Sequence, residues 1–212
     1  MKNNIFVLNK SFYTRLDVLQ ISKELLGKYI VTNIDGQRTV GMIVETEAYR
    51  APDDKACHAY TNKRTERTEV MFREGGAAYV YLCYGIHHLF NVVTAEMNIA
   101  HAVLVRAIEP IEGVDIMLKR RKFTDNKPSL TNGPGKLCVA LGIKTIFSGV
   151  SLTESLGVIY IEDRGTIIAP SQIVAGPRVG IFGAKESRFW DWRFRIKDNP
   201  WTSKPNIVRY ED

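Results

Sequence analysis

The stretch from Ala77 to Thr94 constrains the fold most. Two runs, residues 77–83 and 86–94, alternate in the manner of β-strands, and only Tyr84 and Gly85 separate them. Side chains two residues apart share one face of a strand, so each run can turn one face toward a core. A glycine between two such runs is typical of a tight hairpin turn. The pattern therefore predicts an antiparallel hairpin with Tyr84 at its tip.

The rest of the chain mixes further strands with helices. Asp35-Gly36 is a turn signal between two strands, and Gly142 can end a short helix. Apolar spacing predicts helices at 15–26, 111–122 and 137–141. The predicted strands are 28–33, 39–47, 102–107, 158–162, 165–169, 172–175 and 194–196. Hairpins with segregated helices predict an α+β domain around an antiparallel sheet.

Composition and charge narrow the function classes. The 212 residues are 45% hydrophobic, which supplies a core, and the net charge of +6 favours an anionic partner such as nucleic acid. The three cysteines include no CxxC, which indicates a reducing compartment rather than a disulfide framework or structural zinc. The apolar run at 5–8 is too short for a signal peptide, and nothing approaches the ~20 residues of a membrane span. We expect an intracellular protein without membrane contact.

Two carboxylates and a tyrosine alternate at the end of an apolar run. Glu45, Glu47 and Tyr49 would share one face of an extended strand. Arg106 ends another apolar strand and would need a partner if buried, which Glu45 or Glu47 could supply. A carboxylate beside the later tyrosines would suit a flat, π-rich substrate attacked by water. Each residue taken alone could also be an ordinary strand residue.

Other polar residues point to no metal site. His58 is isolated, and His87 and His88 face opposite sides of a regular strand, so they cannot chelate one metal together. The segment 132–136 lacks the full spacing of a nucleotide-binding phosphate loop. Lys136 and the backbone N–H groups there could still hold one phosphate at a helix start. The basic run at 119–122 is either a solvated helix end or a direct contact to nucleic acid.

Several motifs in order resemble one family, the alkyladenine (3-methyladenine) DNA glycosylases of the mammalian type. They are Val44-Glu-Thr-Glu-Ala-Tyr49, Pro52, Asp54, His58, Tyr79-Val-Tyr-Leu-Cys-Tyr-Gly85, Asn91, Val103-Leu-Val-Arg-Ala-Ile-Glu-Pro110, Asn132-Gly-Pro-Gly-Lys-Leu-Cys138, Arg178-Val-Gly180 and Pro200-Trp201. The resemblance runs from about Leu16 to Trp201. It implies one DNA glycosylase domain over residues 1–212, built on a curved antiparallel sheet with surrounding helices and a protruding hairpin.

The resemblance also implies a reaction. A monofunctional base-excision-repair enzyme would flip an alkylated or deaminated purine out of double-stranded DNA and hydrolyse its N-glycosidic bond, leaving an abasic site. Glu47 would be the general base for the attacking water, and Arg106 would help to hold that water. No lysine belongs to this constellation, so no strand nicking is expected, and we place Lys136 at the DNA backbone. The resemblance implies no cofactor and no metal, and we expect a monomer.

The same resemblance implies roles in substrate binding. Tyr49 would stack on one face of the flipped base, and His58 and Tyr81 on the other. Asn91 would stand where the 2-amino group of a normal guanine would clash. Tyr84 would fill the gap left in the duplex. His87 and His88 depart from the family pattern, which carries aromatic residues there.

Two other functions compete with this interpretation. A non-catalytic DNA-binding module could sense distortion with the same wedge, and it would bind DNA without releasing a base. A hydrolase of free nucleosides would need neither a basic surface nor an exposed hairpin tip. Release of a base from duplex DNA, compared with release from free nucleosides, separates the three.

Overall fold

The computed structural model describes residues 5–204. Its strands are β1 (Phe6–Val7), β2 (Tyr29–Ile34), β3 (Gln37–Arg50), β4 (Ala78–Cys83), β5 (His87–Thr94), β6 (His101–Glu112), β7 (Ile159–Asp163), β8 (Ile173–Gly176) and β9 (Arg193–Ile196). Its α-helices are α1 (Lys10–Tyr13), α2 (Val18–Glu24), α3 (Val114–Arg121) and α4 (Pro134–Leu141). Short 3₁₀ helices lie at Tyr60–Asn62, Glu69–Phe72, Pro128–Leu130, Thr145–Phe147, Pro170–Gln172 and Lys185–Phe189.

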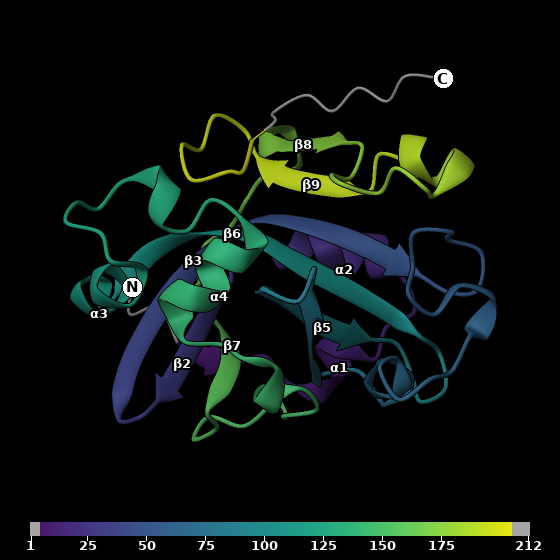
Figure 1. Cartoon of the computed structure of the whole chain (residues 1–212), viewed down its shortest axis with the longest axis horizontal. Helices are drawn as coiled ribbons and strands as arrows, with labels where there is room; N and C mark the ends of the chain where they lie inside the picture. Colours follow the sequence, from purple (N-terminus) through teal and green to yellow (C-terminus); the bar gives the residue numbers. More distant parts are fainter. Residues whose placement is uncertain (1–4, 205–212) are drawn as a thin grey trace.

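The strands form one curved antiparallel sheet, which confirms the predicted α+β class. Its order is β1-β7-β2-β3-β6-β5-β4, and β9 joins β3 to β8. In Figure 1, α4 lies in front of this sheet and α2 behind it, while β8 and β9 cross above. Buried apolar side chains from both helices, among them Ile21 and Leu137, belong to the same core as those of the central strands.

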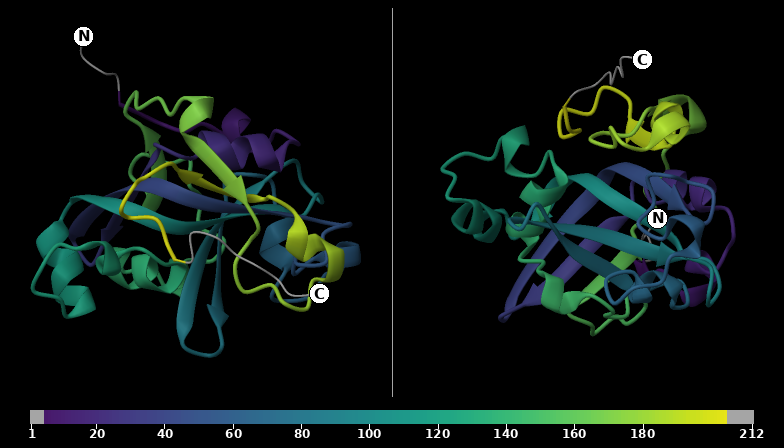
Figure 2. Two further views of the ribbon diagram at one scale, coloured as in Figure 1. Left: turned by 90° about the horizontal axis from the view of Figure 1, so that it is seen from above. Right: turned by 45° about the vertical axis from the view of Figure 1, so that its right-hand side comes forward.

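The hairpin of β4 and β5 projects from the body of the molecule, as the left view of Figure 2 shows. Cys83 pairs with His87, and Tyr84 and Gly85 occupy the turn with φ of 51° and 73°. Positive φ at both central residues is the geometry of a type I′ turn, whose twist matches the strands that it joins. Tyr84 is 89% exposed at the tip. The predicted hairpin and its exposed tyrosine are confirmed.

Strand β3 is the central element for the site. Its first half pairs with β2, its second half pairs with β9, and its other edge pairs with β6 along its length. The register with β6 shifts between Ile43 and Glu45 and again between Glu45 and Thr46. Bulges of this kind re-aim side chains, and they are common beside active sites. Here they lie directly before Glu47.

Local chemistry explains the helix ends. Asp17 accepts hydrogen bonds from the backbone N–H groups of Leu19 and Gln20, both at 3.0 Å, and so begins α2. Gly142 ends α4 at φ 78°, as the sequence predicts. The predicted strand at 165–169 is wrong: Gly165 turns the chain at φ 78°, and Ile167 is 87% exposed. The short helix α1, which Asn9 caps, was not predicted.

Candidate active site

A cavity of about 640 Å³ opens between the β4–β5 hairpin, β6 and the segment 179–184. It gathers six of the residues that the sequence singled out for a site: Tyr49, His58, Tyr81, Tyr84, Asn91 and Arg106. A larger hollow of about 850 Å³ beside α1, α2 and β8 contains none of them. The smaller cavity is therefore the candidate site.

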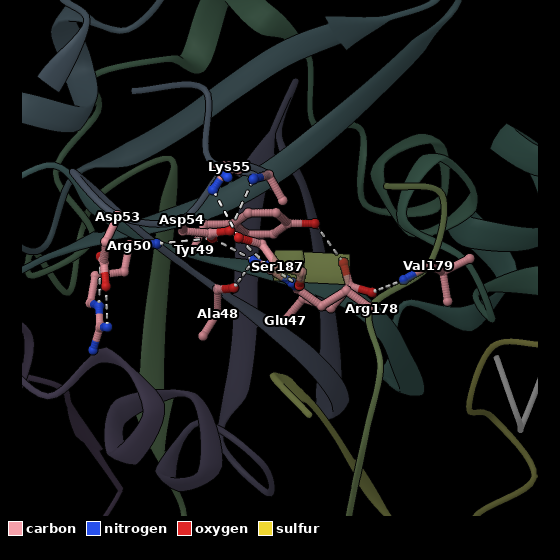
Figure 3. Close-up of polar contacts among 11 residues, drawn as sticks. Glu47, Ala48, Tyr49, Arg50, Asp53, Asp54, Lys55, Arg178, Val179 and Ser187 are labelled. Atoms are coloured by element: carbon pink, nitrogen blue, oxygen red, sulfur yellow. Dashed lines mark hydrogen bonds and ion pairs between the residues drawn. The ribbon is translucent and has the colours of Figure 1, made fainter. Parts of the chain in front are cut away.

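Glu47 is fully buried in β3 and does not itself line this cavity, but it contacts three residues that do, Tyr49, Arg106 and Val179. Figure 3 shows two of its hydrogen bonds: the Tyr49 hydroxyl donates to Oε2 and the backbone N–H of Val179 donates to Oε1, both at 2.8 Å. Nη1 of Arg106 lies 3.2 Å from the same Oε1. Burial, and then the charge of Glu47, raise the pKa of Tyr49 well above its usual value, so this hydroxyl stays protonated and donates. All three of these neighbours of the carboxylate are donors.

Arg106 pairs with both carboxylates, whereas the sequence predicted Glu45 or Glu47 as its partner. Its Nε donates to Oε1 of Glu45 at 3.0 Å, and its Nη2 donates to the Ser203 hydroxyl at 3.3 Å. Burial opposes its charge, but Glu47 and Glu45 outweigh that effect and raise the pKa of Arg106. The guanidinium is therefore permanently positive, and it is the part of this network that reaches the cavity.

Glu45 has a different role from Glu47. It accepts from Arg106, from Nε of Arg193 at 2.7 Å and from the Ser203 hydroxyl at 2.8 Å, and it also accepts from the Ser203 backbone N–H. These bonds tie β3 to β9 and to the segment after it. Glu45 holds Arg106 and the C-terminal strands in place.

Aromatic rings form one wall of the cavity. The His58 ring packs edge-on against Tyr81 with centroids 4.7 Å apart, and Tyr79 lies 5.4 Å from Tyr81. His58 Nδ1 forms a 2.9 Å hydrogen bond with the Tyr79 hydroxyl, which orients the imidazole. Although the residue is exposed at the mouth, burial of the ring and then the charge of Arg67 lower the pKa of His58 to about 4. The ring is neutral at neutral pH.

Tyr49 also lines the cavity, and the sequence did not reveal what supports it. The guanidinium carbon of Arg178 lies 4.7 Å from the Tyr49 ring centroid. Arg178 is fully buried and grips Asp54 through two bonds of 2.6 and 2.8 Å, with a third bond of 2.8 Å to the carbonyl of Ala48 (Figure 3). Arg178 precedes Val179, so one anchored residue supports both the ring of Tyr49 and the N–H that reaches Glu47.

Of three further residues that the sequence singled out, Asn91 lines this cavity, whereas Lys136 and His88 are not part of its lining. Asn91 is buried in β5, and its side-chain N–H donates to the carbonyl of Tyr79 at 3.0 Å across the hairpin. Lys136 lies in the first turn of α4, where its Nζ donates to Oδ1 of Asn132 at 2.8 Å. His88 accepts a 3.2 Å bond from the N–H of Thr145 and so joins the hairpin to the following loop.

Among residues 5–204, the cations that line the cavity are Lys55, Arg67 and Arg106, and only Arg106 was predicted from the sequence. Lys55 and Arg67 fall in segments whose charge resembles that of an ordinary solvated loop. Nothing in residues 5–204 gathers three or more potential metal ligands from His, Cys, Asp or Glu. Within the same residues, no helix combines the length and apolar character that crossing a membrane requires.

Sequence comparison with known proteins identifies the family of this chain. A sequence model of the methylpurine-DNA glycosylases matches residues 11–200. A protein of Chlamydia felis is 50% identical over 192 residues, which is 90% of this chain and 96% of that protein. A protein of Bacillus cereus is 46% identical over 200 residues (92% and 97%), and one of Clostridium perfringens is 46% identical over 204 residues (93% and 98%). All three are provisionally named 3-methyladenine DNA glycosylases.

Proposed function

This chain belongs to the methylpurine-DNA glycosylase family and is a DNA-3-methyladenine glycosylase, a hydrolase acting on N-glycosyl bonds, and from that premise we propose how it works. It flips an alkylated or deaminated purine out of duplex DNA into the cavity between Tyr49 and the wall of His58 and Tyr81. A water activated by Glu47 then attacks the sugar and leaves an abasic site. This reaction is the first step of base-excision repair.

The hydrogen bonds of Glu47 carry this proposal. An ionised carboxylate offers about four acceptor positions. Tyr49, Val179 and Arg106 occupy three of them. One position remains for a water, on Oε2 beside the bond from Tyr49, while Arg106, which lines the cavity, lies against Oε1. Three donors hold the Glu47 carboxylate in one orientation, so a water bound to it would be held in one position as well.

The same carboxylate can serve a second purpose. Departure of the base leaves positive charge on the deoxyribose, and a fixed negative group nearby stabilises that charge without reorganising. An alkylated purine is already electron-deficient and is a good leaving group. For an alkylated purine, positioning of water and stabilisation of charge therefore suffice, and no cofactor is required.

Stacking offsets the cost of extrusion. Unpairing and unstacking a base costs a few kcal/mol, least for a damaged pair. Aromatic side chains contribute about 1–3 kcal/mol per stacked base and accept different purines. Tyr49 and Tyr81 would supply these faces, and Tyr84 would fill the vacated position in the duplex. Its strained φ of 51° supports a functional role, because a bulky residue rarely adopts that conformation without one.

Recognition of DNA and exclusion of normal bases involve two more residues. Asn91 would meet the 2-amino group of guanine and reject it. Lys136, at the first turn of α4, would bind a backbone phosphate. We propose a monomer that acts on the DNA of the cell, which in a prokaryote is the nucleoid.

The lysine nearest to the cavity does not favour strand nicking. Lys55 lines the cavity, although the sequence suggested that no lysine would belong to the site. Its Nζ lies 2.6 and 2.8 Å from the two carboxylate oxygens of Glu186, which raises the pKa of Lys55. A protonated amine cannot attack the sugar, so we propose a monofunctional glycosylase.

Duplexes that each carry one defined lesion test the whole proposal. The expected product is the free damaged base, identified by mass, together with an intact strand that holds an abasic site. Borohydride should trap no covalent adduct. Binding without base release would indicate a non-catalytic sensor of damaged DNA, and release from free nucleosides at the same rate would indicate a nucleoside hydrolase.

A further inference from the structure

The charges that line the cavity are not all balanced. Lys55 is paired with Glu186 at 2.6 Å, and Arg106 is paired with Glu45 and Glu47. Arg67 lines the same cavity, but no carboxylate among residues 5–204 forms an ion pair with it. Arg67 therefore contributes the uncompensated positive charge of the cavity lining in the part of the chain that the structure describes.

This charge lies directly on the aromatic wall. The guanidinium carbon of Arg67 is 4.8 Å from the ring centroid of Tyr81, and its Nη2 is 3.4 Å from Nε2 of His58. Tyr81 and His58 are the residues proposed to stack on one face of the flipped base. Because His58 is neutral at neutral pH, the charge of this wall is the charge of Arg67.

The other wall carries a cation of a different kind. Arg178 lies against Tyr49, but its two bonds to Asp54 balance its charge. A π face attracts a cation through the negative charge above the ring. On the Tyr81 wall, a guanidinium that has no ion-pair partner within residues 5–204 already makes this interaction. A positively charged base entering the cavity would meet like charge there.

We propose that Arg67 sets the charge preference of the cavity and favours neutral purine lesions over cationic ones. The inference rests on the proposed function, whose substrates include both kinds. A nucleotide methylated at N3 of adenine carries a fixed positive charge, whereas hypoxanthine is neutral and of similar size. Excision of a neutral lesion also requires more catalysis, because a neutral base is a poorer leaving group than a cationic base.

The expected effect is moderate because Arg67 is exposed and water screens its charge. We expect that removing the charge changes the preference about fivefold, which corresponds to about 1 kcal/mol. The probe pair is 3-methyladenine and hypoxanthine in duplexes of one sequence. Neither base has a 2-amino group, so Asn91 does not affect the comparison.

The test is the ratio of single-turnover excision rates in Arg67→Gln. We expect the rate for 3-methyladenine relative to hypoxanthine to rise about fivefold. Arg67→Lys keeps the charge and should stay close to the original ratio. An unchanged ratio would overturn the proposal, and an equal fall of both rates would then indicate that Arg67 only contacts phosphate.

Arg64→Gln is the matched control. Arg64 belongs to the same segment and is also exposed, but it pairs with Glu69 at 2.8 Å and lies over Phe72, outside the cavity. This variant should leave the ratio unchanged. An equal shift in both variants would mean that general surface charge, rather than Arg67, sets the preference.

Titration of His58 by NMR in protein without DNA supplies a readout that does not depend on catalysis. Loss of the neighbouring charge in Arg67→Gln should raise the pKa of His58 from about 4. An unchanged value would place Arg67 away from the wall and would overturn the proposal. If the unmodified protein releases neither base, the proposed function fails, and the titration still decides whether Arg67 acts on this wall.

Discussion

The backbone N–H of Val179 donates a 2.8 Å hydrogen bond to Oε1 of Glu47, a residue 132 positions earlier in the chain. The bond exists because the preceding residue, Arg178, is locked onto Asp54 and stacked on Tyr49. A single ion pair thus fixes the donor to the proposed base and the ring proposed to hold the substrate. The Asp54–Arg178 pair therefore stabilises the fold and also positions two residues of the proposed site.

Arg178→Met should strongly destabilise the protein. The substitution leaves the fully buried Asp54 carboxylate without its cation, and breaking a buried pair in this way costs about 3–5 kcal/mol. Urea denaturation measures the loss. The double variant with Asp54→Leu removes the unpaired charge, so it should recover part of the stability but not the excision rate. Equal stability of the single variant and the original protein would contradict this account.

Tyr84→Ala should weaken specific binding of lesion DNA and extrusion of the base. Tyr84 is 89% exposed at the hairpin tip and packs against little of the protein, so the free energy of unfolding should stay within about 0.5 kcal/mol. A fluorescent base analogue beside the lesion reports extrusion. The same brightening with both proteins would refute a wedge at this position.

Asn91→Ser should relax the rejection of normal guanine. The shorter side chain leaves room for a 2-amino group, so release of undamaged guanine should rise relative to release of hypoxanthine. The measurement is the ratio of the two bases released from matched duplexes. Because Asn91 also bonds to the Tyr79 carbonyl, thermal unfolding of the variant must accompany the measurement. A ratio equal to that of the original protein would show that Asn91 does not exclude normal guanine.

DNA binding should depend strongly on salt. With a net charge of +6, several phosphates should be neutralised, and each contributes about 0.9 to the negative slope of log affinity against log salt. Lys136→Gln should reduce the magnitude of that slope by about one phosphate contact. Affinity measured from low to high salt gives both slopes. A slope near zero would favour a free nucleoside as substrate, and an unchanged slope in the variant would move the phosphate contact elsewhere.

Sequence patterns predicted the features that depend on local geometry. The Tyr84 hairpin and the turn at Asp35-Gly36 follow from turn chemistry, and Gly142 ends its helix for the same reason. Alternation in β3 placed Glu45 and Glu47 close enough for Arg106 to reach both. The turns and the helix end have their cause in a short stretch of sequence, whereas the contact with Arg106 also needs the pairing of β3 with β6.

The parts that the sequence did not reveal depend on distant contacts. The Asp54–Arg178 pair joins residues 124 positions apart, and the Val179 donor is a backbone group with no side-chain signature. Arg178-Val179-Gly180 did appear among the family motifs, but nothing in the spacing assigned it a role. Arg67 lies in a charged segment, and only the folded chain shows that it reaches the aromatic wall.

Glu47→Gln tests the central claim. Glutamine keeps the size of the side chain but cannot accept the proton of the attacking water. Glu45→Gln, the neighbour on the same strand, is a control for stability rather than for chemistry, because Glu45 holds Arg193 and Ser203. Both proteins should therefore be compared at equal folded fraction.

The most direct measurement is single-turnover excision of hypoxanthine by Glu47→Gln at saturating enzyme, with lesion-DNA affinity measured on the same preparation. We expect the rate to fall by at least about 10²–10⁴-fold, the range for a lost general base, while affinity stays equal or increases. An excision rate close to that of the original protein would contradict the assignment of Glu47 as the base.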